Sequence, residues 1–260
     1  MVRSAERALE ILEISAAQKK GLKHGEIAQV LNIPKSSLSK LLVSLVSKGY
    51  LTLDRASRSY AIGPQILVLA SSYLASLDVV QVSQPIVHEV MSKTGESSSL
   101  MIKKGKEALI VYKEISNQPM IIATLNIGDL VPLYASACGK AMLAFLPEEE
   151  LDRYFSSVEL TPLTPKTITD PVRLRRDLDN IRVSGIAYSD EETYKDLFGM
   201  ATPVFDWDHR VVASLTVSFP RMRLNPERKK MIANVLQDSS TEISRKLGQS
   251  RNPVSFHEKA

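Results

Sequence analysis

The pattern of apolar and polar positions between residues 25 and 50 predicts two short helices joined by a tight turn. Ile27, Val30 and Leu31 are expected to share the buried face of the first helix. The Asn32-Ile-Pro34 segment ends that helix, because proline cannot continue an α-helix and disfavours helical dihedral angles in its predecessor. From Ser36 onward, apolar residues recur at the spacing of a second helix with one buried face: Leu38, Leu41, Leu42, Leu45 and Val46.

The outer face of this second helix is small, hydroxylated and basic, and it carries Ser37, Lys40, Ser44 and Ser47. Short side chains let a helix approach the major groove of DNA, where hydroxyls bond to base edges and lysines contact phosphates. A serine-rich face is also common on ordinary solvated helices, so the motif by itself leaves both interpretations open.

The residues that follow favour the DNA-binding interpretation. Gly49 is suited to end the second helix. Residues 50–54 and 59–62 have the composition of two short strands, and the turn between them carries Arg55 and Arg58. A helix-turn-helix followed by a basic hairpin is the pattern of a winged helix.

Charge is distributed unevenly along the chain. Residues 1–62 contain ten lysines and arginines against five acidic residues, a net charge of +5. The whole chain carries +4, so residues 63–260 carry −1. A positive excess confined to the segment with the helix-turn-helix is expected of a phosphate-binding module attached to a non-binding one.

Two further helices are predicted around this module. Ser4 is expected to cap a helix that runs to about Gln18, and Arg3 and Arg7 near its start could reach a phosphate or the minor groove. Residues 65–76 are apolar almost all round. Such a helix is best explained if it packs on both domains or on its copy from a second subunit, so we predict a linker helix that forms part of a dimer contact.

The second half of the chain predicts an α+β domain of sensor type, in which strands are flanked by helices. Helices are expected over residues 84–94, 147–155, 171–183 and 226–247, and small residues between 135 and 144 lead into another. Strands are expected over residues 97–103, 108–115, 120–125, 186–189, 201–205 and 211–218.

The bulk properties limit the class of protein. At 260 residues and 44% hydrophobic content, the chain is long enough for two domains with ample cores. Its single cysteine excludes an intrachain disulfide and fits a reducing compartment. The sequence has neither a signal-peptide core nor an apolar run that could cross a bilayer, so we expect a cytoplasmic protein without a membrane partner. No motif calls for a cofactor or a metal.

Short motifs along nearly the whole chain resemble the isocitrate lyase regulator (IclR) family of bacterial transcription factors. They are Arg7-Ala-Leu-Glu-Ile-Leu12, Leu31-Asn-Ile-Pro-Lys-Ser-Ser37, Leu41-Leu42, Lys48-Gly-Tyr-Leu51, Tyr60-Ala-Ile-Gly63, Thr94-Gly-Glu96, Gly139-Lys-Ala-Met-Leu-Ala144, Thr164-Pro-Lys-Thr-Ile-Thr169, Asp190-Glu-Glu192 and Pro203-Val-Phe-Asp206. So many short matches in the family's order make the resemblance highly specific.

The resemblance implies a winged helix-turn-helix domain over residues 1–63, a linker helix over 64–77, a GAF/PAS-like effector-binding domain over 78–248 and a flexible tail over 249–260. Members of the family act as dimers or tetramers on near-palindromic operators, and their effectors are small organic molecules, often carboxylates or aromatic compounds. The chain is therefore expected to regulate transcription by binding double-stranded operator DNA as a homo-oligomer, under the control of such an effector.

Two sets of site residues are expected. The DNA-binding set is Arg3, Arg7, Lys35, Ser36, Ser37, Ser39, Lys40, Arg55 and Arg58. The effector-binding set, carried over from the family, is Ala137, Cys138, Gly139, Asp190, Gly199, Thr216 and Ser218. This chain has Asp196 where the family often has a glycine and Gly199 where it often has a cysteine, so the loop over 194–198 is expected to follow its own course.

The chemistry of the second set suits an organic effector. Backbone amides near Cys138 and Gly139, at the start of a helix, could hold an anionic group. Thr216 and Ser218 add hydroxyl donors, whereas Asp190 would have to accept from a hydroxyl or an ordered water.

An enzyme and a DNA-architectural protein are the alternatives. Ser37 and Lys40 match the S-x-x-K pattern of serine acylases but lie on the predicted recognition helix, without an oxyanion-hole partner. Cys138 could pair with a histidine as a nucleophile, and Asp190-Glu-Glu192 with His209 could bind a metal. The four histidines are His24, His88, His209 and His257. A purely architectural protein would leave the near-neutral second domain without a purpose.

Overall fold

The computed structural model describes residues 3–18, 20–69, 79–116 and 125–249. The chain divides into two compact units, Met1–Ser76 and Leu77–Ala260, called here the N-terminal and the C-terminal unit. The N-terminal unit has one hydrophobic core, and the C-terminal unit has two. The finer domain boundaries given above stay predictions.

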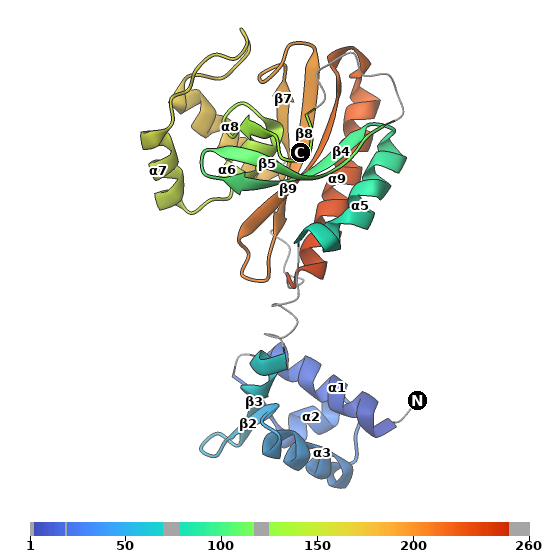
Figure 1. The fold of residues 1–260 in the computed structure, drawn as a ribbon. Helices are drawn as coiled ribbons and strands as arrows, with labels where there is room; N and C mark the ends of the chain where they lie inside the picture. Colours follow the sequence, from blue (N-terminus) through green and yellow to red (C-terminus); the bar gives the residue numbers. More distant parts are fainter. Residues whose placement is uncertain (1–2, 19, 70–78, 117–124, 250–260) are drawn as a thin grey trace. The chain divides into compact units, whose positions relative to one another are not determined.

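The N-terminal unit contains the helix-turn-helix and the hairpin that the sequence predicts (Figure 1). Its elements are α1 (Arg3–Ala16), β1 (Leu22–Lys23), α2 (His24–Val30), α3 (Lys35–Ser47), β2 (Leu51–Asp54) and β3 (Ser59–Ile62). The strands form an antiparallel sheet in the order β1-β3-β2. Strand β1 was not predicted, because two residues are too few to show an alternating pattern.

The packing of these helices corrects two details. Ile27 is fully buried, but Val30 is 64% exposed and does not share its face. Helix α2 ends at Val30, and the left-handed φ of 50° at Asn32 then brings Ile33 into the core instead. Ser4 lies inside α1, which begins at Arg3, and so does not cap it.

Residues 65–69 are helical and form the described part of the predicted linker helix. Leu67, Val68 and Leu69 follow one another and are between 53% and 69% exposed. Positions 70–76 of the predicted helix lie outside the described residues, and the dimer contact stays a prediction.

The C-terminal unit is built on a six-stranded antiparallel sheet in the order β6-β5-β4-β9-β8-β7. Its strands are β4 (Ser97–Lys104), β5 (Glu107–Glu114), β6 (Leu130–Pro132), β7 (Ala187–Asp190), β8 (Leu197–Phe205) and β9 (Val211–Pro220). Its helices are α5 (Val79–Thr94), α6 (Ala137–Leu143), α7 (Glu148–Ser157), α8 (Pro171–Ser184) and α9 (Pro226–Lys246), with a short 3₁₀ helix at Arg221–Arg223. The strand predicted over 120–125 lies, apart from Leu125, outside the described residues.

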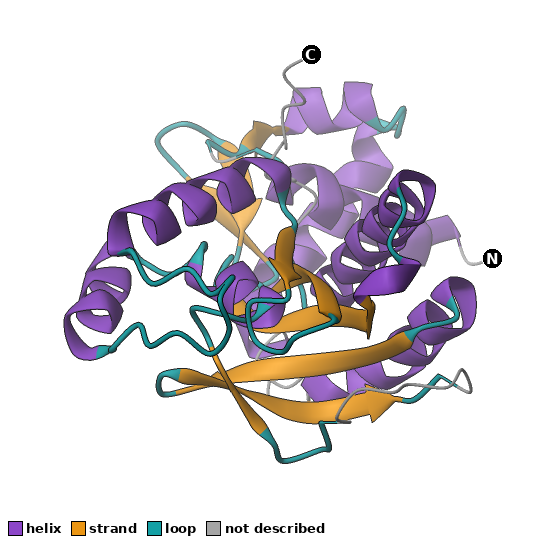
Figure 2. Ribbon diagram, turned by 90° about the horizontal axis from the view of Figure 1, so that it is seen from above, coloured by secondary structure: helices purple, strands orange, loops and turns teal. Residues whose placement is uncertain are grey.

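The two faces of this sheet carry different helices. Helices α5 and α9 lie side by side on one face, and α6 packs on the other (Figure 1). Figure 2 shows helices on both sides of the strands in a view from above. Along β9, Leu215 and Val217 pack toward α5 and α9, whereas Thr216 and Ser218 point toward α6, because successive side chains of a strand alternate between faces. The observed fold is the predicted α+β arrangement.

Strand β8 is longer than the sequence predicted. It begins at Leu197, where that residue pairs with Pro220, and not at Ala201. Gly199 lies in its interior, and an interior glycine is typical of a loop or a bulge in a sequence pattern. The last two residues of the loop expected over 194–198 therefore belong to the sheet.

Candidate functional site

The predicted recognition side of α3 is open to solvent. Its exposed residues, called here the α3 face, are Lys35, Ser36, Ser39, Lys40, Val43, Ser44 and Ser47. Ser37 is half-buried and lies at the edge of this face. Leu38, Leu42 and Leu45 occupy the opposite side of the helix and are buried in the core. The amphipathic pattern thus places hydroxyl and ammonium groups on the exposed side of α3.

Ser39 is less available than its exposure suggests. Its hydroxyl donates to the backbone oxygen of Lys35 at 2.9 Å and lies 3.0 Å from Nε2 of His24 on α2. Because a serine hydroxyl has a single proton, the histidine nitrogen must then be the donor in the second contact. Ser39 therefore ties α2 to α3 and helps to fix the angle between the two helices.

The hairpin tip is folded by one carboxylate. Asp54 accepts hydrogen bonds from the backbone nitrogen of Ala56 at 2.8 Å and from the hydroxyl of Ser57 at 2.7 Å. These hydrogen bonds, that of Ser57 first, lower the pKa of Asp54. Arg55 and Arg58 are both exposed on this tight turn, and Arg58 has a left-handed φ of 53°. The wing thus holds two guanidinium groups outward.

The remaining predicted DNA contacts lie on α1. Arg7 is half-buried, and the side chain of Arg3 lies outside the described part of the chain. Whether either one reaches DNA depends on how α1 lies against a duplex, so both stay predictions.

The C-terminal unit contains a cavity between its sheet and α6. Five of the predicted effector residues line it, namely Ala137, Cys138, Gly199, Thr216 and Ser218. They come from α6, β8 and β9, which are far apart in the sequence and meet only in the fold. The cavity has a solvent-accessible volume of about 70 Å³, which is room for roughly five waters or a small organic molecule.

Gly199 keeps part of this cavity empty. A Cβ atom built there would lie 3.4 Å from the Cβ of Ala137 and 4.0 Å from the hydroxyl oxygen of Ser218, which is ordinary contact. A larger side chain would extend beyond these contacts into the cavity. Gly199 is thus in a position to set the size of the ligand.

Asp190 does not line the cavity. The residue before it on β7, Ser189, does so, and its hydroxyl donates to the backbone oxygen of Ala135 at 2.8 Å. Because strand neighbours alternate, Asp190 points to the opposite face, where its carboxylate accepts from Nε of Arg221 at 2.6 Å. Asp190, the residue expected from the sequence, is thus one position away from the residue that lines the cavity. A shift of one position along a strand places a side chain on the opposite face of the sheet.

Gly139 also has a structural task and does not line the cavity. A Cβ at this position would lie 2.2 Å from the Cα of Leu133, so only glycine lets α6 pack this closely on the preceding segment. The amide of Gly139 is already bound to the hydroxyl of Ser136, the N-cap of α6, at 3.1 Å. This amide is therefore not free for an anion, contrary to the expectation for this helix start.

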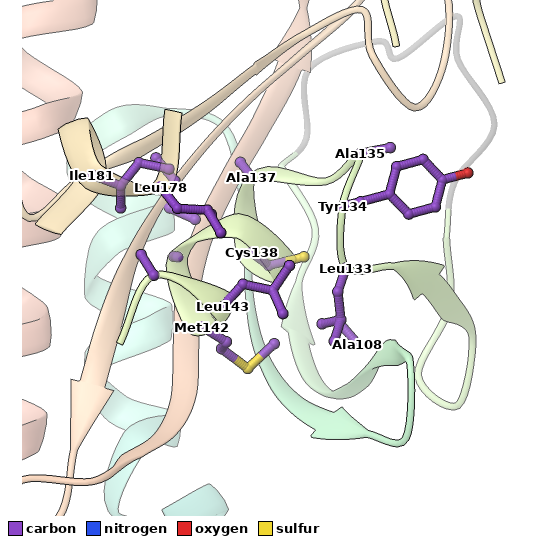
Figure 3. Close-up of a cluster of buried hydrophobic side chains, with 14 of the residues drawn as sticks. Ala108, Leu133, Tyr134, Ala135, Ala137, Cys138, Met142, Leu143, Leu178 and Ile181 are labelled. Carbon is purple, nitrogen blue, oxygen red and sulfur yellow. The ribbon is translucent and has the colours of Figure 1, made fainter. Parts of the chain in front are cut away.

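Cys138 lies in an apolar cluster, beside Leu133 and Leu143 (Figure 3). Burial raises the pKa of its thiol to about 11, so the sulfur is protonated at neutral pH. The histidines that the structure describes are engaged elsewhere: His24 with Ser39, His88 with Glu114 and His209 with Gln249. His257 lies outside the described residues. A neutral thiol without a nearby base is a poor nucleophile, which favours a cavity-lining role.

Lys113 on β5 is a cavity residue that the sequence analysis missed. Among the described lining residues it is the one charged side chain, and the negative charge of Asp129 acts on it from outside the lining. Its ammonium group donates to the backbone oxygen of Leu125 at 2.5 Å, and burial lowers the pKa of Lys113. Simple alternation along β5 does not predict it, because Ile110 lines the cavity three residues earlier and a register shift between Leu100 and Met101 of the paired strand reverses the faces of β5 between the two residues.

A second lysine is almost completely buried behind the cavity. Lys140 on α6 is 1% exposed, and its Nζ lies 2.8 Å from Oδ2 of Asp177 and 2.7 Å from Oε1 of Glu192. Burial raises the pKa of Glu192, and the charge of Lys140 partly offsets this effect. The three residues join α6, α8 and the segment after β7, whose Thr193 and Tyr194 line the cavity.

The acidic segment 190–192 is therefore used in ion pairs rather than gathered around a metal. Lys166 pairs with Glu191, as Lys140 does with Glu192. Within the described ranges, no group of three or more His, Cys, Asp or Glu side chains is arranged to hold a metal ion. In the same ranges, every helix is too short or too polar to cross a membrane.

Two family models match the chain. One, described as the IclR helix-turn-helix domain, matches residues 4–55, and the other, described as the bacterial transcriptional regulator IclR C-terminal domain, matches residues 71–245. The first match lies within the N-terminal unit, and the second covers most of the C-terminal unit and begins six residues before it.

Two bacterial transcriptional regulators are similar to this chain along most of its length. The HTH-type transcriptional regulator KipR of Bacillus subtilis is 31% identical over 88% of this chain and 91% of its own length. The HTH-type transcriptional regulator BhcR of Paracoccus denitrificans is 30% identical over 94% of this chain and 86% of its own. Because these relatives are regulators, the prediction of a regulator rather than an enzyme is confirmed.

Solved structures agree with this match. The crystal structure of the Thermotoga maritima IclR protein is 31% identical, with a TM-score of 0.64, and the match covers 95% of this chain and all of that one. The repressor BlcR of Agrobacterium tumefaciens is 25% identical, with a TM-score of 0.83 over 96% of this chain and 99% of its own. The exposed helix-turn-helix, the separate α+β unit and these matches show that the chain belongs to the IclR family of bacterial transcriptional regulators.

Proposed function

We propose that this regulator binds a near-palindromic operator through two or more copies of the α3 face, as a dimer or a tetramer in the bacterial cytoplasm. A small organic acid in the C-terminal cavity controls its affinity for DNA or its output at the promoter. The observation that carries the first part is the open α3 face. If these serines and lysines were packed in the core instead, α3 would have no polar surface with which to contact bases.

The charge of the N-terminal unit supports the DNA-binding half of the proposal. Lys35 and Lys40 lie on the α3 face, and Arg55 and Arg58 lie on the wing. Cations on two separate elements suit a helix in the major groove with its flanks on the phosphates. One such unit contacts a single half-site, so a symmetric operator requires a second copy of the chain.

The lining of the cavity supports an acid as the effector. Hydroxyl groups of Ser189, Thr216 and Ser218 surround it, and Lys113 supplies a half-buried cation whose hydration is reduced. An ammonium group in this state gains most from a carboxylate, because a charged partner replaces the lost hydration. A neutral aromatic compound would fill the same space without using Lys113.

The proposed effector set follows from the geometry. It retains Ala137, Cys138, Gly199, Thr216 and Ser218 and adds Ser189 and Lys113. Asp190 and Gly139 leave the set, because the first pairs with Arg221 and the second packs against Leu133.

Selection of duplexes from a randomised DNA library by the full chain tests the DNA-binding half. We expect a near-palindromic sequence with half-sites about one or two helical turns apart and at least two chains per duplex by analytical ultracentrifugation. An asymmetric selected site bound by one chain would contradict the proposal.

A thermal-shift screen tests the effector half. The panel pairs small carboxylic acids with their primary amides, and a ligand bound only by the folded state raises the melting temperature. We expect acids to be preferred and the active ones to change affinity for the selected duplex. A preference for the amides would contradict the assignment of an acid.

A further inference from the structure

Val43 lies on the α3 face as its one large apolar side chain. It is 71% exposed and shares a straight stripe with Ser36, Lys40 and Ser47, at successive spacings of four, three and four residues. This stripe is opposite the buried side of the helix. Val43 therefore stands in the middle of the surface proposed to face DNA.

Neither folding nor solubility accounts for a valine at this position. It makes no contribution to the core formed by Leu38, Leu42 and Leu45, and β-branched residues are weaker helix formers than most alternatives at an exposed site. Residues that break a local rule without a structural gain are expected at functional sites.

Exposure by itself would prove little, because single exposed apolar residues are normal on protein surfaces. Val30 on α2 is 64% exposed in the same unit. What distinguishes Val43 is its surroundings, with Lys40 one turn before it and Ser47 one turn after it. An apolar group framed by phosphate-binding and base-binding groups matches the major groove, where the thymine methyl is the one apolar feature of the base edges.

We propose that Val43 reads the 5-methyl group of a thymine in each half-site of the operator. The inference rests on the proposed DNA-binding function and specifies what one position of α3 recognises. Ser36 and Lys40 precede the valine along the stripe and position the helix through base edges and phosphates. The hydroxyls of Ser39 and Ser47 both donate to backbone oxygens of α3, so Ser39 contributes to the placement of the helix and Ser47 offers DNA a hydrogen-bond acceptor.

The test removes the methyl group from the DNA. In a duplex selected by the full chain, each thymine is replaced in turn by uracil, which keeps every hydrogen-bonding group and loses only the methyl. At one thymine per half-site, uracil should weaken binding by the wild-type chain about fourfold, as expected for one buried methyl group. The V43A variant should bind the thymine and uracil duplexes equally well.

Matched variants separate this role from a general loss of folding. V30A removes an equally exposed valine from α2 and should keep the wild-type sensitivity to uracil. V43T keeps one methyl group and should keep part of the sensitivity. Circular dichroism and the melting temperature show that each variant is folded.

The outcomes distinguish the inference from the function on which it rests. If the chain selects no duplex at all, the proposed function fails. If it selects a duplex but no thymine is sensitive to uracil, or V43A retains the sensitivity, the inference is overturned and the proposed function stands.

Discussion

The α3 face and the C-terminal cavity use the same kinds of side chain in opposite ways. Lys40 and Ser36 point outward from a helix, whereas Lys113 and Ser218 point inward from strands. The outward set faces water and suits a large, highly charged polymer. The inward set is withdrawn from water and suits one small molecule. Burial, more than residue type, separates the two functions.

The comparison is sharpest between two lysines. Lys40 is exposed, whereas Lys140 is 1% exposed and depends on Asp177 and Glu192. Loss of one partner from a buried ion pair is costly because the charges left behind have no water. Substitutions of the two lysines should therefore differ in their effect on stability.

The largest effect is expected for Lys140→Met. It leaves the buried carboxylate of Glu192 and the partly exposed carboxylate of Asp177 without their cation, and it should lower the free energy of unfolding of the C-terminal unit by about 3 kcal/mol. The same substitution at Lys40 should change stability by less than about 0.5 kcal/mol. Denaturant unfolding of the full chain measures both, and similar small effects for the two variants would refute the distinction.

The next effect concerns the size of the cavity. Gly199→Val places two methyl groups beyond the Cβ position, which is already 3.4 Å from Ala137. We expect effector affinity to fall at least about a hundredfold, close to 2.7 kcal/mol, while unliganded DNA binding is retained. Gly199→Ala is the matched control and should cost much less. Calorimetry with an acid found in the screen decides the matter, and normal binding by the valine variant would remove Gly199 from the site.

A smaller effect is expected for Lys113→Met. Loss of a hydrogen bond to a charged group should weaken an acid about tenfold and leave its amide unchanged. Lys103→Met changes an exposed lysine on the neighbouring strand β4 and should leave both ligands unaffected. If the amide loses as much affinity as the acid, the lysine acts on the shape of the cavity and not on the charge of the ligand.

The two regions also differ in how far the sequence predicts them. The exposed positions of the α3 face can be predicted from local spacing. The apolar residues identify the buried side of the helix, and the opposite side must then be exposed. The prediction that Val30 is buried is wrong because α2 ends at this residue, and the apolar spacing of a helix no longer applies where the helix stops.

The cavity depends on more distant relations. The family resemblance indicates Asp190, whereas Ser189 lines the cavity, because a resemblance gives a position but does not show which face of a short strand it occupies. Lys140 and Glu192 lie 52 residues apart in the sequence and meet only after α6 packs against the segment that follows β7. Lysine is usually an exposed residue, so the local sequence pattern predicts neither that Lys113 lines a cavity nor that Lys140 is buried.

Entry of the α3 face into DNA can be measured through the salt dependence of binding. Affinity of the full chain for its selected duplex is measured over a range of salt concentrations for the wild type, Lys40→Ala and the control Lys103→Ala. We expect Lys40→Ala to weaken binding by roughly 1–3 kcal/mol if the lysine contacts a base, or to lower the salt slope by about one if it contacts a phosphate. Unchanged affinity together with an unchanged slope for Lys40→Ala would contradict it.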